Sequence, residues 1–209
     1  MAFHVRLSRR TAKREPLRRF VIFCEGEKTE PAYFRALERK YKRNTLIDLE
    51  IVPVGVPMTI AQRASAQMKR RGRNSFEEKD QIWAVFDRDE HPNYEAAIGM
   101  CRQNRVHVAR SNPCFELWLI LHESDYDSSD HRGAVQRRLK SLRPEYDPAN
   151  GKSCDCMDLV LRVEQAEARA SRQLQRREQE GAPFGPPSTT VGHLTAAIRE
   201  AALAAGSPF

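Results

Sequence analysis

Acidic residues follow apolar segments at two places in the chain. Glu25 ends the run 20–24, and Asp87 and Asp89 end the run 81–86. Short apolar runs are typical of buried strands, and α/β proteins bind ligands beyond the carboxyl ends of their parallel strands. Carboxylates that converge there repel one another unless a cation joins them, and hard oxygen ligands select Mg²⁺ or Mn²⁺. Such an ion supports phosphodiester cleavage by activating water and stabilising the leaving oxygen.

The Asp-x-Asp turn alone is a weak signal, because acidic turns after strands are common. Its combination with Glu25-Gly26 after an earlier strand strengthens the metal-site interpretation. The adjoining Gly26-Glu27-Lys28-Thr29 is no Walker loop, since Glu27 stands where that pattern needs its second glycine. Arg88, between the two aspartates, either holds a phosphate or pairs with its neighbours.

Alternating strand and helix patterns must position these side chains. We expect strands at 20–24, 46–54, 81–86 and 105–109, and helices at 29–41, 59–69, 93–104 and 114–122. This alternation predicts an α/β fold with a mostly parallel four-stranded sheet flanked by helices. It defines a catalytic domain over 19–122, on which 123–209 packs as a helical carboxyl-terminal extension. In that extension we expect an acidic loop at 123–130 and helices at 135–142, 157–180 and 190–204.

Charge is concentrated at the start of the chain. The 209 residues carry a net charge of +7, and residues 1–19 hold seven basic residues against Glu15 alone. We expect residues 1–18 to form a disordered basic arm whose Arg9 and Arg10 bind a phosphate backbone. A solvated tail is the alternative. A second basic cluster, which includes Arg70 and Arg71, either lines a nucleic-acid path or is the solvated end of a helix.

Several protein classes are excluded by composition. No apolar stretch approaches the 18 residues of a membrane span, and no signal-peptide pattern follows the basic start. Five cysteines, two of them within apolar runs, do not form a disulfide scaffold. These features predict a cytoplasmic protein with no membrane partner. His91 and His122 could transfer protons, although isolated histidines are more often structural.

Three blocks resemble a known family. Phe-Cys-Glu-Gly-Glu-Lys-Thr-Glu-Pro-x-Tyr-Phe at 23–34, Val-Phe-Asp-Arg-Asp-Glu-His at 85–91 and Ser-Asn-Pro-Cys-Phe-Glu-Leu-Trp-Leu at 111–119 are similar to the RloB family. Pro-Ser-Thr-Thr-Val at 187–191 resembles its carboxyl-terminal segment. The acidic pattern also resembles the TOPRIM domain of topoisomerases, primases and OLD-type nucleases.

The resemblance implies a TOPRIM-like fold and a Mg²⁺- or Mn²⁺-dependent nuclease in phage-defence or restriction-linked operons. It implies a nucleic-acid substrate, with DNA favoured over RNA, and a partner ATPase of the RloA type. By position, Glu25 matches the general acid or base and also a metal ligand, and Asp87 and Asp89 match the metal-binding aspartates. Lys28 would neutralise a scissile phosphate.

One departure from the pattern leaves the number of metal ions open. OLD-type nucleases usually carry a second glutamate four residues after the first, but Thr29 stands there, and Glu27 and Glu30 are the nearest candidates. Glu30 is therefore included among the metal ligands. Glu116 either supplies a further catalytic carboxylate or is a polar residue favoured by a helix dipole. A non-catalytic module that binds nucleic acid or the ATPase is the alternative function, and nucleotidyl transfer ranks third.

Overall fold

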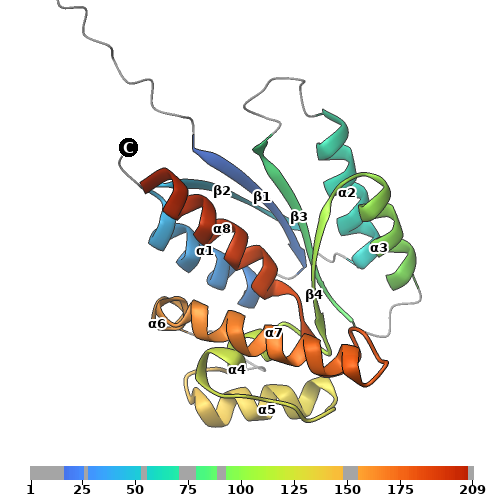
Figure 1. The fold of residues 1–209 in the computed structure, drawn as a ribbon, viewed down its shortest axis with the longest axis vertical. Coiled ribbons are helices and arrows are strands. Elements are labelled where there is room, and N and C mark those ends of the chain that lie inside the picture. The colour runs from blue at the N-terminus through green and yellow to red at the C-terminus, as the bar shows by residue number, and fades with distance from the viewer. Residues whose placement is uncertain are drawn as a thin grey trace, which may run out of the picture.

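The computed structural model describes residues 17–25, 28–52, 56–70, 79–88, 93–147 and 155–206. One sheet has the strand order β2-β1-β3-β4-β5 (Figure 1). Its strands are β1 (Arg18–Glu25), β2 (Thr45–Val52), β3 (Gln81–Asp87), β4 (His107–Asn112) and β5 (Ser188–Thr189). β1 to β4 are parallel, and β5 pairs antiparallel with β4. The predicted α/β fold with a mostly parallel sheet is confirmed, and β5 adds a strand to the four expected.

Helices cover both faces of the sheet. They are α1 (Thr29–Tyr41), α2 (Pro57–Arg70), α3 (Tyr94–Gln103), α4 (Glu116–Glu123), α5 (Arg132–Leu142), α6 (Cys156–Leu161), α7 (Val163–Gln179) and α8 (Val191–Gly206). α2 and α3 cover one face, α1 and α8 cover the other, and α4 to α7 gather beyond the carboxyl ends of the strands (Figure 1). Among the described residues, none of these helices combines the length and hydrophobicity needed to cross a bilayer.

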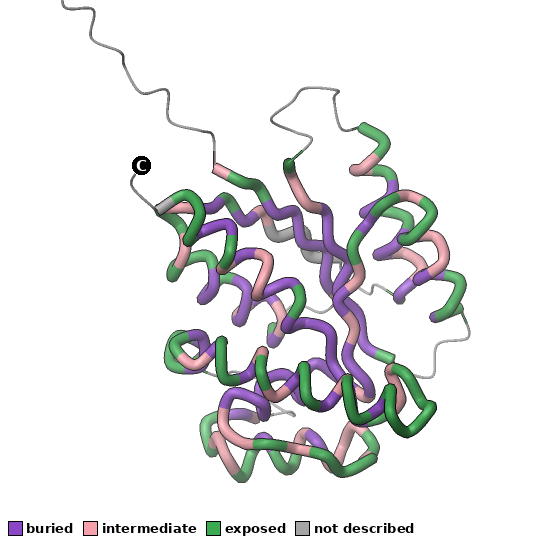
Figure 2. Tube along the Cα trace, viewed as in Figure 1, coloured by how far each residue is buried: buried purple, intermediate pink, exposed green. Residues whose placement is uncertain are grey.

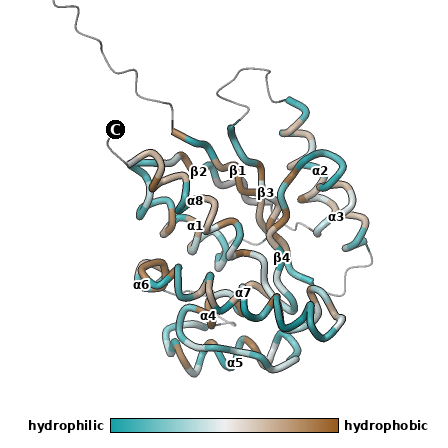
Figure 3. Tube along the Cα trace, in the orientation of Figure 1, coloured by the Kyte–Doolittle hydropathy of each residue, from teal (hydrophilic) through white to brown (hydrophobic). Residues whose placement is uncertain are grey.

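Side-chain alternation along the strands builds two apolar layers. Phe20, Ile22 and Cys24 of β1 join the cluster with α1 and α8, whereas Val21 and Phe23 join the cluster with α2 and α3. The buried, hydrophobic trace therefore runs through the middle of the sheet (Figures 2 and 3). Burial on both faces explains why the strands read as continuous apolar runs in the sequence.

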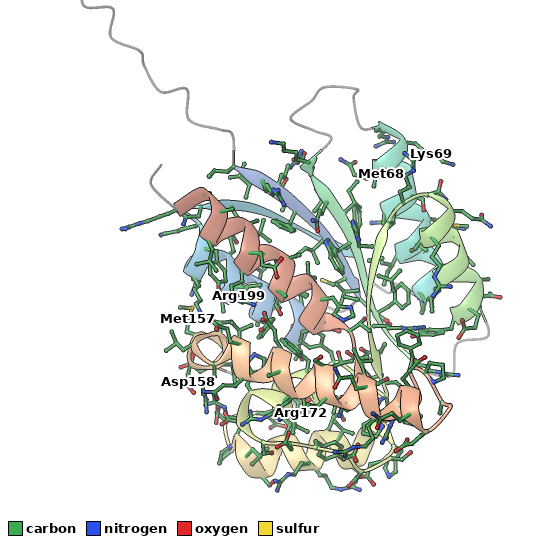
Figure 4. The ribbon with its side chains drawn as sticks, viewed as in Figure 1. Met68, Lys69, Met157, Asp158, Arg172 and Arg199 are labelled. Atoms are coloured by element: carbon green, nitrogen blue, oxygen red, sulfur yellow. The ribbon has the colours of Figure 1, made fainter. Side chains whose placement is uncertain are left out.

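The segments after residue 123 share the core of the sheet. One apolar cluster joins β1 and α1 with α4, α5, α6, α7 and α8. Arg199 of α8, labelled in Figure 4, pairs with Glu167 of α7 at 2.9 Å. The helix predicted over 157–180 is instead α6 and α7, which meet at Arg162. That side chain binds Glu123 and Asp158, each at 2.6 Å, contacts that local sequence does not reveal.

Ion pairs and a hydrogen bond hold the predicted acidic loop, 123–130, against α7. Arg172 pairs with Asp125 at 2.9 Å, and Arg176 pairs with Asp127. Gln173 Nε2 donates to the carbonyl of Tyr126 at 2.6 Å. Contacts within the chain thus occupy part of the polar face of α7, which accounts for a long helix of low hydrophobicity at the surface of the fold.

His122 is a core residue rather than a proton carrier. Its Nδ1 lies 2.9 Å from the carbonyl oxygen of Trp118, which can only accept, so Nδ1 carries the proton. Nε2 then accepts the hydroxyl proton of Tyr33 at 3.0 Å. Burial, followed by the nearby charges of Arg162 and Arg143, lowers the pKa of His122 to about 3 despite the opposing bond to Trp118. The ring is held neutral in the fold.

This neutral histidine predicts a loss of stability in mild acid. The unfolded chain binds a proton near pH 6.5, which the folded chain does not take up until about pH 3, so unfolding becomes easier as pH falls through this window. We expect His122 to contribute a loss of about 2 kcal/mol between pH 6.5 and 5. Urea unfolding at pH 7.5 and 5.0 should show a flatter pH dependence in His122→Gln. His193→Gln, exposed on α8, is the control and should retain the wild-type slope.

Candidate active site

Asp87 ends β3 at the carboxyl edge of the sheet. Its Cα pairs with that of Ser111 in β4, and alternation turns its side chain to the face shared with Val85. The residue is 6% exposed. Arg132, the first residue of α5, places Nη2 3.7 Å from Asp87 Oδ2. A buried carboxylate next to a guanidinium is therefore fixed where the resemblance expects a metal ligand.

Glu116 begins α4 and is even more completely buried, at 1% exposure. Tyr146 Oη donates to its Oε1 at 2.6 Å, and Gln136 Nε2 donates to the same oxygen at 3.2 Å. The amino-terminal end of α4 also favours a negative charge at this position. Glu116 is thus no ordinary surface residue at a helix start, because its carboxylate is enclosed and supplied with donors from α5 and from the segment after it.

Cys114 shows that the two carboxylates share one neighbourhood. Burial raises the pKa of its thiol, and the charges of Glu116 and Asp87 raise it further, while Arg132 opposes the shift. Burial and Glu116 likewise raise the pKa of Tyr146. Both groups therefore stay protonated at neutral pH. Cys114 is no thiolate nucleophile, and both carboxylates lie close enough to act on its neutral thiol.

Glu25 lies at the same edge but on the other face. Cys24 pairs with Val85, so the next residue, Glu25, lies level with Phe86. Because side chains alternate along a strand, Glu25 turns toward the α2–α3 layer, away from the face that Asp87 occupies. Glu30, in the first turn of α1, lies on the Asp87 side. Burial first, and then the charge of Glu30, raises the pKa of the Cys24 thiol, which faces α1. The structure groups Asp87 with Glu116, and Glu30 lies on their side of the sheet.

Predicted phosphate-binding residues fall at different ends of the molecule. Lys28 is exposed immediately before α1, and its carbonyl accepts from the amide of Ala32 at 3.0 Å. Arg88 is exposed directly after Asp87. Arg70 ends α2 beside Lys69, and the carboxyl end of α2 lies at the opposite edge of the sheet from the carboxyl end of β3 (Figure 1). Arg9, Arg10, Arg71, Glu27 and Asp89 lie outside the described residues.

No complete metal site is formed by the residues that the structure describes. Within them, no group of three or more His, Cys, Asp or Glu side chains is arranged to hold a metal ion. The donor chemistry nevertheless suits a hard cation, because Asp87 and Glu116 offer carboxylate oxygens and the neighbouring Cys114 thiol is protonated. The metal requirement therefore stays a prediction, as do the roles of Glu25, Lys28 and Glu30.

Sequence reasoning missed the cationic and hydroxyl partners of this site. Arg132, Gln136 and Tyr146 follow Glu116 by 16 to 30 residues and lie in segments without a chemical motif. Cys114 lies in the block 111–119 that resembles the family, but its apolar surroundings in the sequence indicate only a buried thiol. The one available signal was the enclosed position of Glu116 in an apolar segment, because a buried carboxylate requires donors from elsewhere in the fold.

The fold and this edge define the class of protein: an α/β protein with a mostly parallel sheet and buried carboxylates beyond its carboxyl ends. The family model described as "RloB: RloB-like protein" matches residues 20–198, and the chain belongs to this family. The match includes every strand except the first two residues of β1, and the first half of α8. No curated protein and no solved structure matches the chain.

The enclosure of Glu116 can be tested through its hydroxyl donor. Tyr146→Phe leaves the buried carboxylate with one donor fewer, and we expect it to lower the free energy of unfolding by about 1–3 kcal/mol. Tyr126→Phe removes a matched bond, from its Oη to Asp130 at 2.6 Å, at a more exposed site. We expect that control to cost about 1 kcal/mol or less. Equal small losses in urea titrations of the two variants would contradict the assigned enclosure.

Proposed function

We propose that the protein is a Mg²⁺- or Mn²⁺-dependent nuclease that hydrolyses nucleic-acid phosphodiesters, with DNA favoured over RNA. The observation that carries the proposal is the meeting of Asp87 and Glu116 around Cys114 at the carboxyl edge of the sheet. This is the edge at which parallel α/β sheets bind ligands. Membership of the RloB-like family and the TOPRIM-like acidic pattern support the same reaction class.

Each candidate site residue has a role in the proposed reaction that suits its chemistry. Asp87 would hold the ion, together with Asp89 and with Glu116 or Glu30 as further oxygen donors. When bound, the ion would activate water and stabilise the leaving oxygen. Glu25, at the end of the adjacent strand, would accept or donate the proton. Lys28 would neutralise the scissile phosphate, and its exposure leaves the ammonium accessible to a large substrate.

Arg132 adds a positive charge beside the acidic pair, which is Asp87 and Glu116. Its guanidinium lies 3.7 Å from Asp87 and is 40% exposed. A partly solvated arginine can turn away at modest cost, because ion pairs that retain contact with water contribute little to stability. In this proposal Arg132 supplies positive charge to Asp87 before the ion arrives, and it then becomes available to a substrate phosphate.

The alternative function is a non-catalytic module that binds nucleic acid or an ATPase. One observation favours it: among the described residues no group of three or more candidate ligands is arranged for a metal. In that case the hydrogen bonds of Glu116 and the ion pair of Asp87 would be purely structural. The RloA-type ATPase partner and the role in phage defence are expectations that derive from the family resemblance.

A cleavage assay with an isosteric variant tests the proposal. Supercoiled DNA, linear DNA and RNA are each incubated with Mg²⁺ or Mn²⁺, alone and with a cognate RloA-type ATPase. We expect wild type to cleave, and Asp87→Asn to lower the rate at least about 100-fold, because a metal ligand and its charge are lost. Asp48→Asn, on β2 beside Arg19, makes the same change far from the site and should cleave normally.

Two results would count against this function. Failure of wild type to cleave any of the substrates under all of these conditions would favour the binding module. Wild-type rates in both Asp87→Asn and Glu25→Ala would place the chemistry elsewhere in the chain.

A further inference from the structure

Two arginines share the face of the sheet that Asp87 does not occupy. Arg110 in β4 pairs with Phe86 of β3, so its side chain turns to the α2–α3 face. Arg88 follows Phe86 by two residues, and its amide donates to the carbonyl of Ser111 at 2.8 Å. The pairing of β3 with β4 thus continues to Arg88, and the side chain of Arg88 turns to the same face as that of Phe86. Both guanidinium groups stand at the carboxyl ends of β3 and β4.

Aromatic rings support both guanidinium groups. Arg110 Cζ lies 3.5 Å from the ring centroid of Phe184, and Arg88 Cζ lies 5.8 Å from that of Tyr94. Burial raises the pKa of Tyr94, while Arg110 and then Arg88 act to lower it, so both cations lie near this hydroxyl. A ring stacked on one face of a guanidinium leaves the N–H groups around its edge available to a planar or tetrahedral oxyanion.

These arginines differ from those of α7 in their partners. Arg172, Arg176 and Arg177 each pair with a carboxylate. Among the residues that the structure describes, Arg88 and Arg110 take part in no ion pair with an acidic side chain. Paired arginines stabilise the fold, whereas two neighbouring cations that form no ion pair repel each other and favour an incoming anion.

The loop that carries Phe184 is held in a strained conformation. Phe184 has a φ of 64°, a region that bulky residues rarely adopt and that costs on the order of 1 kcal/mol. Asn112 Nδ2 donates to the Phe184 carbonyl at 3.0 Å. The chain beyond is fixed to β4 by bonds from the Thr190 amide to the Arg110 carbonyl and from the Arg110 amide to Thr190 Oγ1, at 2.8 and 2.9 Å. The ring is therefore positioned beneath Arg110.

We propose that Arg88 and Arg110 form a binding site for backbone phosphates of a nucleic-acid strand, with Phe184 and Tyr94 as positioning residues. The inference rests on the proposed function for its choice of nucleic acid as the ligand. Arg88 adjoins Asp87, and Arg110 adjoins Ser111, which pairs with Asp87. A strand bound by these arginines passes over the carboxyl end of β3, where the acidic pair lies on the opposite face.

Binding without cleavage tests the site directly. Fluorescence anisotropy is measured in EDTA with a labelled 20-nucleotide DNA, the RNA of the same sequence and the DNA duplex, over a range of salt concentrations. We expect Arg88→Gln and Arg110→Gln each to raise Kd about tenfold, because a charged hydrogen bond is lost. Each should also lower the slope of log K against log salt by about one unit.

A matched variant controls for charge alone. Arg102→Gln, exposed in the last turn of α3, makes the same change away from the site and should stay within about twofold of wild type. Arg110→Lys keeps the charge and should retain the salt slope while it loses affinity. Far-UV circular dichroism and thermal unfolding of every variant check that the fold is intact. Because Arg88 is exposed and unpaired by carboxylates, its substitution tests the site even if Arg110 is needed for folding.

Several outcomes separate this inference from the proposed function. Weakened binding in Arg88→Gln and Arg110→Gln, with no cleavage by wild type, would support the phosphate site and count against the nuclease. Cleavage by wild type together with unchanged Kd and salt slope in both variants would overturn the phosphate site and leave the nuclease standing. Failure of wild type to bind any of the three probes would also overturn the phosphate site.

Discussion

A carboxylate buried as completely as that of Glu116 must be supplied with hydrogen-bond donors, and much of the fold around the site follows from this requirement. Without them, the cost of removing the charge from water would exceed the margin by which small proteins are stable. The donors come from α5 and from Tyr146, so both segments must dock against the start of α4. The position of α5 in turn brings Arg132 to Asp87. One buried charge thus fixes the arrangement of the whole carboxyl edge.

The sheet separates the acidic pair Asp87 and Glu116 from two arginines at this edge. Asp87 and Glu116 are enclosed on the side of the sheet that packs against α1, whereas Arg88 and Arg110, like Glu25, turn to the opposite face. Adjacent residues of one strand therefore present opposite charges to opposite sides. Such an arrangement keeps the arginines from neutralising the acidic pair, although only a few residues of backbone separate them.

The parallel sheet could be predicted because its strands are buried on both faces and so appear as apolar runs bounded by turns. Residues 20–24 and 81–86 show this pattern, and the structure confirms β1 and β3 there. The two-residue strand β5 could not be predicted, since its pairing with β4 depends on contacts some 80 residues away. Nor could the break at Arg162, where both flanking segments favour a helix and only tertiary ion pairs distinguish the residue.

The candidate site was predictable in part for the same reason. Asp87 and Glu25 are marked by local sequence, because each ends an apolar run. The face of the sheet to which each side chain turns depends on strand register, and the register can be assigned only when the paired strand is known. Glu116 was marked as a candidate, but its donors were not, since hydrogen bonds between distant segments leave no periodic trace in a sequence.

The pairing of β5 with β4 and the packing of α8 on β2 and β4 bear on how the chain folds as it leaves the ribosome. Asn44 Nδ2, before β2, donates to the carbonyl of Ala202 at 2.9 Å, so this segment gains its partner only after another 158 residues have been made. Until residues 188–206 emerge, the apolar face of β1 and α1 lacks α8 as its cover. Until then the nascent chain carries this exposed apolar surface, and chaperones bind chains in such a state.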